Sequence, residues 1–160
     1  LYLKKLFSKI NYRNIQKMNL HTPEVSEFSA VIAKELKVRK IIKIFQKKYV
    51  EQKKTIVLEG RDMSKIFHNA DVKFFVVCKP LKIAAKRRWL QLKNSKKNIS
   101  LNQVLKDLKK RDFMDRNRKH SPLERDQESV YINTAKLNIK AVLDKMSKII
   151  GKKLKDKYGS

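Results

Sequence analysis

The run of residues 72–78, VKFFVVC, most constrains what this chain can fold into. After Lys73 every position is apolar, without the alternation of polar and apolar residues typical of a strand with one wet face. Such a run predicts a strand covered on both faces, as in a parallel sheet. Residues 55–59 and 129–133 have the composition of two further short strands.

Helical patterns alternate with these strands. We predict helices over residues 22–49 with a break near 34–37, over 81–93, over 101–118 and from 138 to 150, followed by a frayed basic tail. Residues 1–10 also carry apolar side chains at helical spacing. Thr22, Ser100 and Asn138 are suited to cap three of these helices. The alternation favours an α/β fold with a parallel sheet flanked by helices.

The segment 100–123 changes character halfway along. Its first half has a core-facing stripe formed by Leu101, Val104, Leu105 and Leu108. The same stripe continues as Arg111, Asp115 and Arg118. One interpretation is a helix end in water with ordinary ion pairs, and the other is a cleft in which the arginines bind an anion. Seven of the nine arginines lie between Arg61 and Arg125, which favours the cleft because arginine binds phosphate through two parallel hydrogen bonds.

Composition sets further limits. The chain of 160 residues has a net charge of +26, which suits nucleic acid, an acidic membrane surface or a phosphorylated substrate, although lysine-rich coding bias explains much of it equally well. The single Cys78 is expected to be a small buried residue, and the three histidines lack the spacing of a metal site. No apolar run is long enough to span a membrane, so we expect a cytoplasmic protein.

A second group of candidate residues follows the strand predicted at 55–59. Gly60, Arg61 and Asp62 would then lie at the carboxyl end of a parallel strand, where ligands gather in such sheets. The alternative is a turn with a solvated ion pair. Arg87 and Arg88 could add a cationic patch, but adjacent residues cannot share a helix face, so at least one should point to solvent.

Several motifs occur in the order found in one family. They are TPEVS at 22–26, VR at 38–39, EGRDM at 59–63, NADVKFF at 69–75, KRRWLQL at 86–92, SLNQVLKDLKKRD at 100–112, DRNR at 115–118 and SPL at 121–123. In these motifs the chain resembles bacterial cytidylate kinases, the P-loop nucleoside monophosphate kinases that transfer a phosphoryl group from ATP to CMP or dCMP. The similarity runs from about residue 20 to residue 150.

The resemblance implies a role for each matching residue. Arg39 and Asp62 match positions that read the cytosine, and Arg61 and Arg118 match ligands of the CMP α-phosphate. Arg111 and Asp115 match residues that hold the sugar and order the lid. Arg87 and Arg88 resemble a lid pair that stabilises the transferred phosphoryl group. The implied partners are CMP or dCMP and ATP, and the implied cofactor is Mg²⁺, in pyrimidine nucleotide metabolism, without a membrane or nucleic-acid partner.

The chain also departs from the family. It contains no GxxxxGK[ST] sequence, and its three glycines, Gly60, Gly151 and Gly159, cannot build such a loop. Asn133 stands where the family has Asp, and Met114 stands at a lid position that is often basic. We therefore expect a nucleoside monophosphate kinase-like sheet whose central P-loop strand is missing.

The expected organisation follows from this departure. We expect a partial kinase domain at 1–150, with 1–50 as the remnant of the monophosphate-binding region and 85–120 as the lid and its flanking helices, and a basic tail at 151–160. The chain would be a C-terminal fragment, inactive alone, and either a monomer or paired with a missing N-terminal segment. The alternatives are a non-catalytic remnant of a broken gene and a basic nucleic-acid-binding module.

Overall fold

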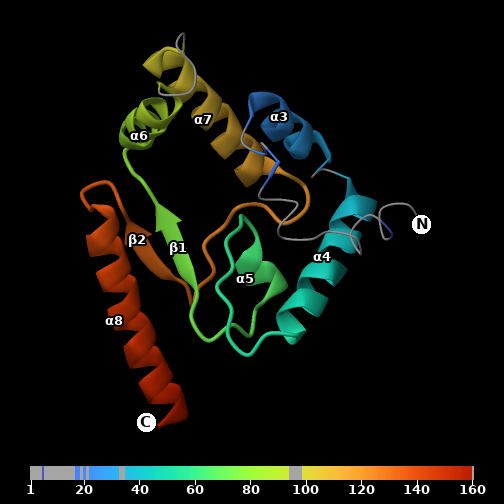
Figure 1. The fold of residues 1–160 in the computed structure, drawn as a ribbon, viewed down its shortest axis with the longest axis vertical. Coiled ribbons are helices and arrows are strands. Elements are labelled where there is room, and N and C mark those ends of the chain that lie inside the picture. The colour runs from blue at the N-terminus through green and yellow to red at the C-terminus, as the bar shows by residue number, and fades with distance from the viewer. Residues whose placement is uncertain are drawn as a thin grey trace. The chain divides into compact units, whose positions relative to one another are not determined.

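The computed structural model describes residues 5, 17, 18, 20, 22–32, 35–93 and 99–159. The chain divides into two compact units, residues 1–59 and 60–160. The first unit contains helices α3 (Pro23–Ile32) and α4 (Leu36–Glu51). The second contains, in order, α5 (Met63–Ile66), β1 (Phe74–Val77), α6 (Leu81–Lys93), α7 (Leu101–Asn117), β2 (Val130–Asn133) and α8 (Ile139–Tyr158), labelled in Figure 1.

The two helices of the first unit confirm the prediction for residues 22–49. The Thr22 hydroxyl accepts from the backbone N–H of Val25 at 3.2 Å, as expected of a residue that caps α3. The helical path is interrupted before Leu36, close to the predicted break. The helix expected over residues 1–10 falls outside the described residues, apart from Lys5.

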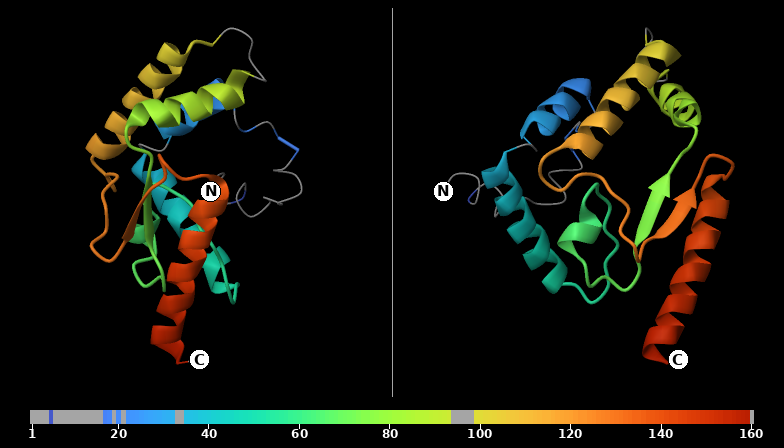
Figure 2. Two further views of the ribbon diagram at one scale, coloured as in Figure 1. Left: turned by 90° about the vertical axis from the view of Figure 1, so that its left-hand side faces the viewer. Right: turned by 180° about the vertical axis from the view of Figure 1, so that it is seen from behind.

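The second unit is built on a parallel pair of strands. Phe74 lies opposite Val130 and Val77 opposite Asn133, and Ile132 is the largest fully buried side chain among the described residues. The chain passes from β1 to β2 through α6 and α7, which pack against each other beyond the carboxyl ends of the strands (Figure 1, Figure 2). This α/β arrangement with a small parallel sheet flanked by helices agrees with the predicted fold class.

Two expectations about the strands are wrong. Residues 55–59 form no strand, and Val57 in the middle of that segment is 92% exposed. A strand exists only where another backbone completes its hydrogen bonds, and within the described residues β1 and β2 alone pair in this way. The strand expected over 72–78 is shorter, and Val76 is 49% exposed, so β1 is not covered on both faces in the described part of the chain.

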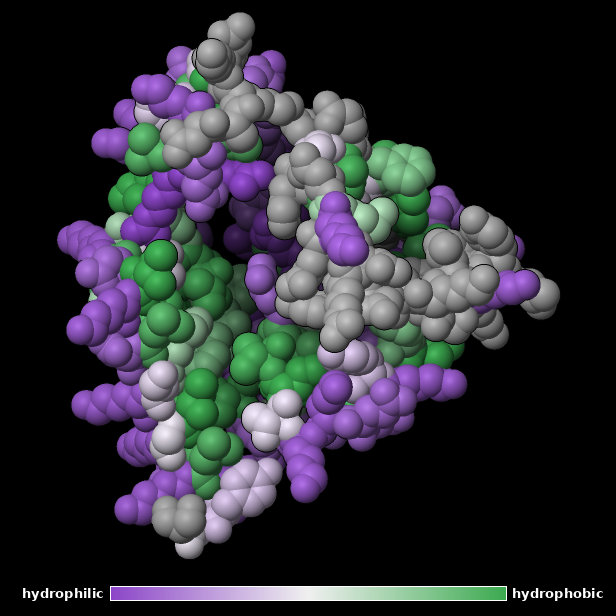
Figure 3. Space-filling view, in the orientation of Figure 1, coloured by the Kyte–Doolittle hydropathy of each residue, from purple (hydrophilic) through white to green (hydrophobic). Residues whose placement is uncertain are grey.

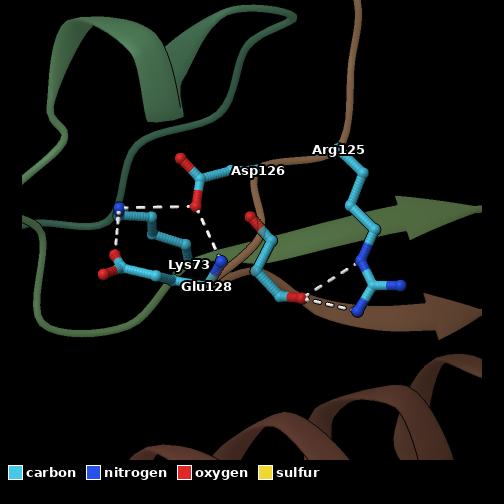
Figure 4. Close-up of polar contacts among 5 residues, drawn as sticks. Lys73, Arg125, Asp126 and Glu128 are labelled. Atoms are coloured by element: carbon cyan, nitrogen blue, oxygen red, sulfur yellow. Dashed lines mark hydrogen bonds and ion pairs between the residues drawn. The ribbon is translucent and has the colours of Figure 1, made fainter.

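Ion pairs fasten the amino-terminal end of the sheet, as Figure 4 shows. The Lys73 ammonium lies 2.7 Å from Glu128 Oε2 and 3.6 Å from Asp126 Oδ1, and only 7% of the Lys73 side chain is exposed. The hydrogen bond to Glu128, aided by the charge of Asp126, raises the pKa of Lys73. The Arg125 guanidinium donates twice to the carbonyl oxygen of Ser129. These contacts hold the segment before β2 against the start of β1.

Helix α8 returns beside the sheet, antiparallel to β2. It begins at the predicted cap, where the Asn138 carboxamide oxygen accepts from the N–H of Ala141 at 2.8 Å. The predicted fraying after Ile150 is wrong, because the helix continues to Tyr158 and ends on Gly159, whose φ of 65° is the left-handed conformation favoured at helix ends. The reason is that Lys157 and Tyr158 bind Asp71, just before β1, at 2.6 and 2.9 Å.

The side chains of α8 divide into two kinds. Figure 3 shows a hydrophilic edge along the helix beside a hydrophobic strip. The hydrogen bond from Lys157 lowers the pKa of Asp71 and correspondingly raises the pKa of Lys157.

Among the helices of the described chain, none has the length and apolar character needed to cross a membrane.

Candidate functional site

Helix α7 presents the candidate site at its carboxyl-terminal end. The helix starts where predicted, with the Ser100 hydroxyl accepting from the N–H of Gln103 at 3.1 Å. Val104 is buried, as its place on the apolar stripe requires. About four turns after Ser100, at 3.6 residues per turn, the same stripe reaches Asp115, which is also largely buried. Local capping and periodicity therefore turn a carboxylate toward the interior of this unit.

Asp115 is shared by two arginines. Its Oδ2 lies 3.4 Å from Arg61 Nε, and its Oδ1 lies 3.7 Å from Arg118 Nη1. The side chains of Asp115 and Arg118 are only 17% and 18% exposed, whereas that of Arg61 is 43% exposed. Both distances exceed ordinary hydrogen-bond length, so these contacts are electrostatic and leave donors and acceptors available.

The chain turns sharply after α7 and folds back on the end of the helix. Arg118 ends the helix in an extended conformation, and its Nε donates to the carbonyl oxygen of Ser121. Ser121 has a φ of 51°, which is uncommon for a residue other than glycine. The N–H of Leu123 then donates to the Asp115 carbonyl oxygen at 2.8 Å, so one carbonyl of the last turn gains a partner. The SPL segment thus fixes the position of the Arg118 guanidinium.

Two polar atoms of this site are buried without a hydrogen-bond partner. They are Asp115 Oδ2 and Arg118 Nη2. A buried polar atom that stays unpaired costs about 1–3 kcal/mol, so such atoms are expected to meet a ligand or water. Arg118 Nη2 needs an acceptor, and Asp115 Oδ2 needs a donor. A molecule that carries an anionic oxygen and a hydroxyl group close together would satisfy both atoms.

The segment 60–66 forms the other wall of the site. Arg61 reaches Asp115 from this segment, and the ammonium of Lys65 lies 2.8 Å from Glu124 Oε2, in the chain that follows α7. Asp62 precedes α5, and its carbonyl oxygen accepts from the N–H groups of Lys65 and Ile66. Ion pairs therefore join this segment to residues on both sides of the turn after α7, although residues 55–59 form no strand.

The other predicted site residues lie elsewhere. Arg111 is exposed one turn before Asp115 on α7. Arg88 is exposed on α6, with Gln91 Oε1 at 3.5 Å, as expected for one member of an adjacent pair. Arg39 is partly buried in α4, which belongs to the first unit.

Arg87 has the most extensive contacts of the candidate arginines. Its Nη2 donates to the carbonyl oxygens of Thr134, Ala135 and Leu137 at 2.9, 3.2 and 3.0 Å. Its Nη1 lies 3.4 Å from the Thr134 hydroxyl and 3.9 Å from the sulfur of Cys78, which is half-buried rather than buried. No sequence pattern indicates these acceptors, because carbonyl groups are present in every loop. The Trp89 indole N–H donates to the Ile99 carbonyl oxygen at 2.9 Å.

Comparison with known proteins places these motifs in one family. The sequence pattern of the family described as cytidylate kinase matches residues 3–152. The chain belongs to the cytidylate kinase family. A cytidylate kinase of Clostridium botulinum strain Loch Maree is 36% identical over 135 residues, which are 84% of this chain and 59% of that protein. Those of Syntrophotalea carbinolica and Geobacter sulfurreducens are each 33% identical, over 84% and 82% of this chain.

The chain spans less than three fifths of the length of these cytidylate kinases, 57% and 56% for the latter two. The parallel sheet with flanking helices is compatible with a nucleoside monophosphate kinase-like fold. The sequence resemblance noted above therefore identified the family correctly.

Proposed function

We propose that this chain is the part of a cytidylate kinase that binds the phosphoryl acceptor, CMP or dCMP. The observation that carries the proposal is that two neighbouring buried atoms, Arg118 Nη2 and Asp115 Oδ2, have no hydrogen-bond partner among the described residues. A nucleoside monophosphate brings a phosphate oxygen for the guanidinium and a sugar hydroxyl for the carboxylate. Membership of the cytidylate kinase family supports the same acceptor.

Each residue of the site then has a defined task. Arg118 and Arg61 bind the α-phosphate, because both guanidinium groups lie beside Asp115 and Arg118 keeps one nitrogen unpaired. Asp115 accepts from the sugar and keeps the two guanidinium groups together in the absence of ligand. Arg111, exposed on the same helix, contacts the sugar side.

The remaining roles rest on the resemblance alone. Arg39 and Asp62 read the cytosine. Arg88, which is exposed and weakly bound to Gln91, is free to reach the transferred phosphoryl group. Phosphoryl transfer needs positioning and charge neutralisation more than covalent catalysis, so arginines are suited to these tasks.

The residues of this chain do not fit an ATP and Mg²⁺ site of the P-loop type. No GxxxxGK[ST] sequence occurs in the 160 residues. Of the three glycines, Gly151 lies within α8 and Gly159 ends that helix, so neither belongs to a phosphate-binding loop. We therefore assign no residue here to the β- and γ-phosphates, and expect the 160-residue chain to bind CMP without transferring a phosphoryl group to it.

Calorimetric titration of the 160-residue chain with CMP tests this proposal. We expect CMP to bind more tightly than UMP or inorganic phosphate, because base, sugar and phosphate would all be recognised. A coupled assay with ATP and CMP should give no turnover. A folded chain that does not distinguish CMP from inorganic phosphate would contradict acceptor binding, and robust turnover would contradict the assignment of the chain as an acceptor-binding part.

A second candidate is favoured by the net charge of +26, namely a basic module that binds nucleic acid. Its affinity would fall steeply with salt concentration and would depend little on base identity. Binding of CMP by a few arginines predicts the reverse. Titrations of a single-stranded oligonucleotide and of CMP at two salt concentrations separate the two functions. CMP binding without turnover, even after a P-loop segment expressed separately is added, would instead indicate a non-catalytic remnant.

A further inference from the structure

The Arg87 guanidinium bridges two parts of the second unit that are far apart in the sequence. Arg87 lies on α6, and its three carbonyl acceptors belong to residues 134–137, the loop between β2 and α8. Hydrogen bonds from a charged donor are stronger than those between neutral groups, and here the two hydrogens of Nη2 are shared among three carbonyl oxygens. Arg87 and its helix neighbours Lys86 and Arg88 are all exposed, and within the described part of the chain the structure shows for Arg88 only a contact of 3.5 Å with Gln91, so the carbonyl contacts and not burial distinguish Arg87.

The same loop is fixed from its other side by Asn133. The Asn133 carboxamide accepts from the Lys79 N–H and donates to the Lys79 carbonyl oxygen, both at 3.0 Å. Its oxygen also accepts from the N–H of Ala135. This side chain therefore joins the carboxyl ends of β1 and β2 directly. Arg87 adds a link from that junction to α6.

The link matters because, within the described residues, neither α6 nor α7 packs extensively against β1 or β2. In the described part of the chain, the pairs of elements that pack extensively are α6 with α7 and β1 with β2. The two helices thus form a hairpin in which α6 packs against α7 (Figure 1). Asp115 and Arg118 lie at the end of α7, so the orientation of the hairpin also determines where these two side chains lie relative to the sheet.

We propose that Arg87 is a positioning residue that locks the α6–α7 hairpin to the carboxyl ends of the strands. Its guanidinium group is bound by the loop carbonyls at residues 134, 135 and 137, and it acts on the ligand only through the hairpin. This inference rests on the proposed function in one respect, namely that the oriented site binds CMP. The lock itself is a property of the ligand-free chain.

Amide hydrogen exchange of the whole chain tests the lock without any ligand. Arg87→Ala should accelerate exchange in residues 134–137 by about tenfold, because losing even one hydrogen bond to a charged group changes a local equilibrium by that factor. Lys86→Ala removes the same charge from the preceding position and should leave this exchange unchanged. Equal exchange in the two variants would overturn the proposal.

A second arm measures CMP affinity in the same variants. If the unlocked hairpin holds the productive orientation only about a tenth of the time, Arg87→Ala should weaken CMP binding about tenfold. Arg87→Lys keeps the charge but lacks the planar fork, so it should fall between Arg87→Ala and the unsubstituted chain in both measurements. If Arg87→Ala does not fold, Arg87→Lys still tests the proposal in both measurements.

The two arms have separate outcomes. Accelerated loop exchange together with unchanged CMP affinity would show that Arg87 merely stabilises the fold, and would overturn its positioning role. Failure of the unsubstituted chain to bind CMP would refute the proposed function, whereas the exchange experiment would still decide whether the lock exists.

Discussion

Replacing Arg118 by Ala tests the candidate site most directly. The change removes the pairing with Asp115 at 3.7 Å and the hydrogen bond to Ser121, and it removes the unpaired Nη2 that is available to a ligand. Arg61 remains beside the carboxylate, so Asp115 is not left without a cation. We expect the free energy of unfolding to fall by about 2 kcal/mol, which lies within the range of roughly 1.5–3 kcal/mol for one hydrogen bond from a charged group.

The same substitution should also weaken ligand binding. One charge-assisted hydrogen bond from Nη2 to a phosphate oxygen is worth about 2 kcal/mol, which corresponds to about thirtyfold in affinity. Calorimetric titration with CMP, at a temperature where both variants are folded, measures the loss. Inorganic phosphate should show most of the same loss, because the lost contact is to phosphate.

Lys109→Ala is the matched control for Arg118→Ala. Lys109 lies on the same helix and is exposed, so its removal changes the net charge equally without touching the site. We expect its effect on CMP affinity to stay within about threefold, as for a screened surface charge. If the two substitutions weaken CMP binding equally, the charged end of α7 is only a solvated surface and the reasoning is refuted.

Three further predictions concern the sheet and its supports. Ile132→Ala should lower the free energy of unfolding by about 2–5 kcal/mol in urea denaturation, because the side chain is fully buried; a change under about 1 kcal/mol would mean that no core surrounds it. Asn133→Asp should lose the donor to the Lys79 carbonyl and destabilise the chain by about 1–2 kcal/mol in thermal denaturation, and an unchanged melting temperature would refute this pairing. Since Lys157 lowers the pKa of Asp71, that pair stabilises the fold above the ordinary titration range of an aspartate and loses this effect as the pH falls through the lowered pKa. Asp71→Asn should therefore be less stable than the unsubstituted chain in denaturation at neutral pH and equally stable in strong acid, and a difference that persists in acid would contradict the assignment.

Features set by neighbouring residues could be predicted from the sequence. Ser100 and Asn138 cap their helices as expected, because a capping side chain bonds a backbone group only three residues away. The periodic stripe on α7 likewise predicted that Asp115 and Arg118 would face the same way, and the structure pairs them. The family followed from ordered motifs, which the comparisons confirm over residues 3–152.

Features that depend on distant partners could not be predicted in this way. Residues 55–59 have the composition of a strand, but composition does not supply a second backbone. Arg87 was expected to face a ligand. Instead it binds carbonyl groups of residues 134 and 137, which lie 47 and 50 residues further along the chain. No local sequence pattern could reveal partners at that separation. The helical end of α8 depends in the same way on Asp71.

The connection between the two strands has a consequence for folding kinetics. Phe74 pairs with Val130, so the sheet closes a loop of more than fifty residues, at an entropic cost of about 3–4 kcal/mol for a flexible chain. A hairpin formed early would bring the two ends of this loop together and reduce that cost. Destabilising substitutions at Ala85 or Val104, which are buried in α6 and α7, should then slow refolding, whereas those in the strands should mainly accelerate unfolding. The helices that carry the arginines would in that case also guide the assembly of the sheet.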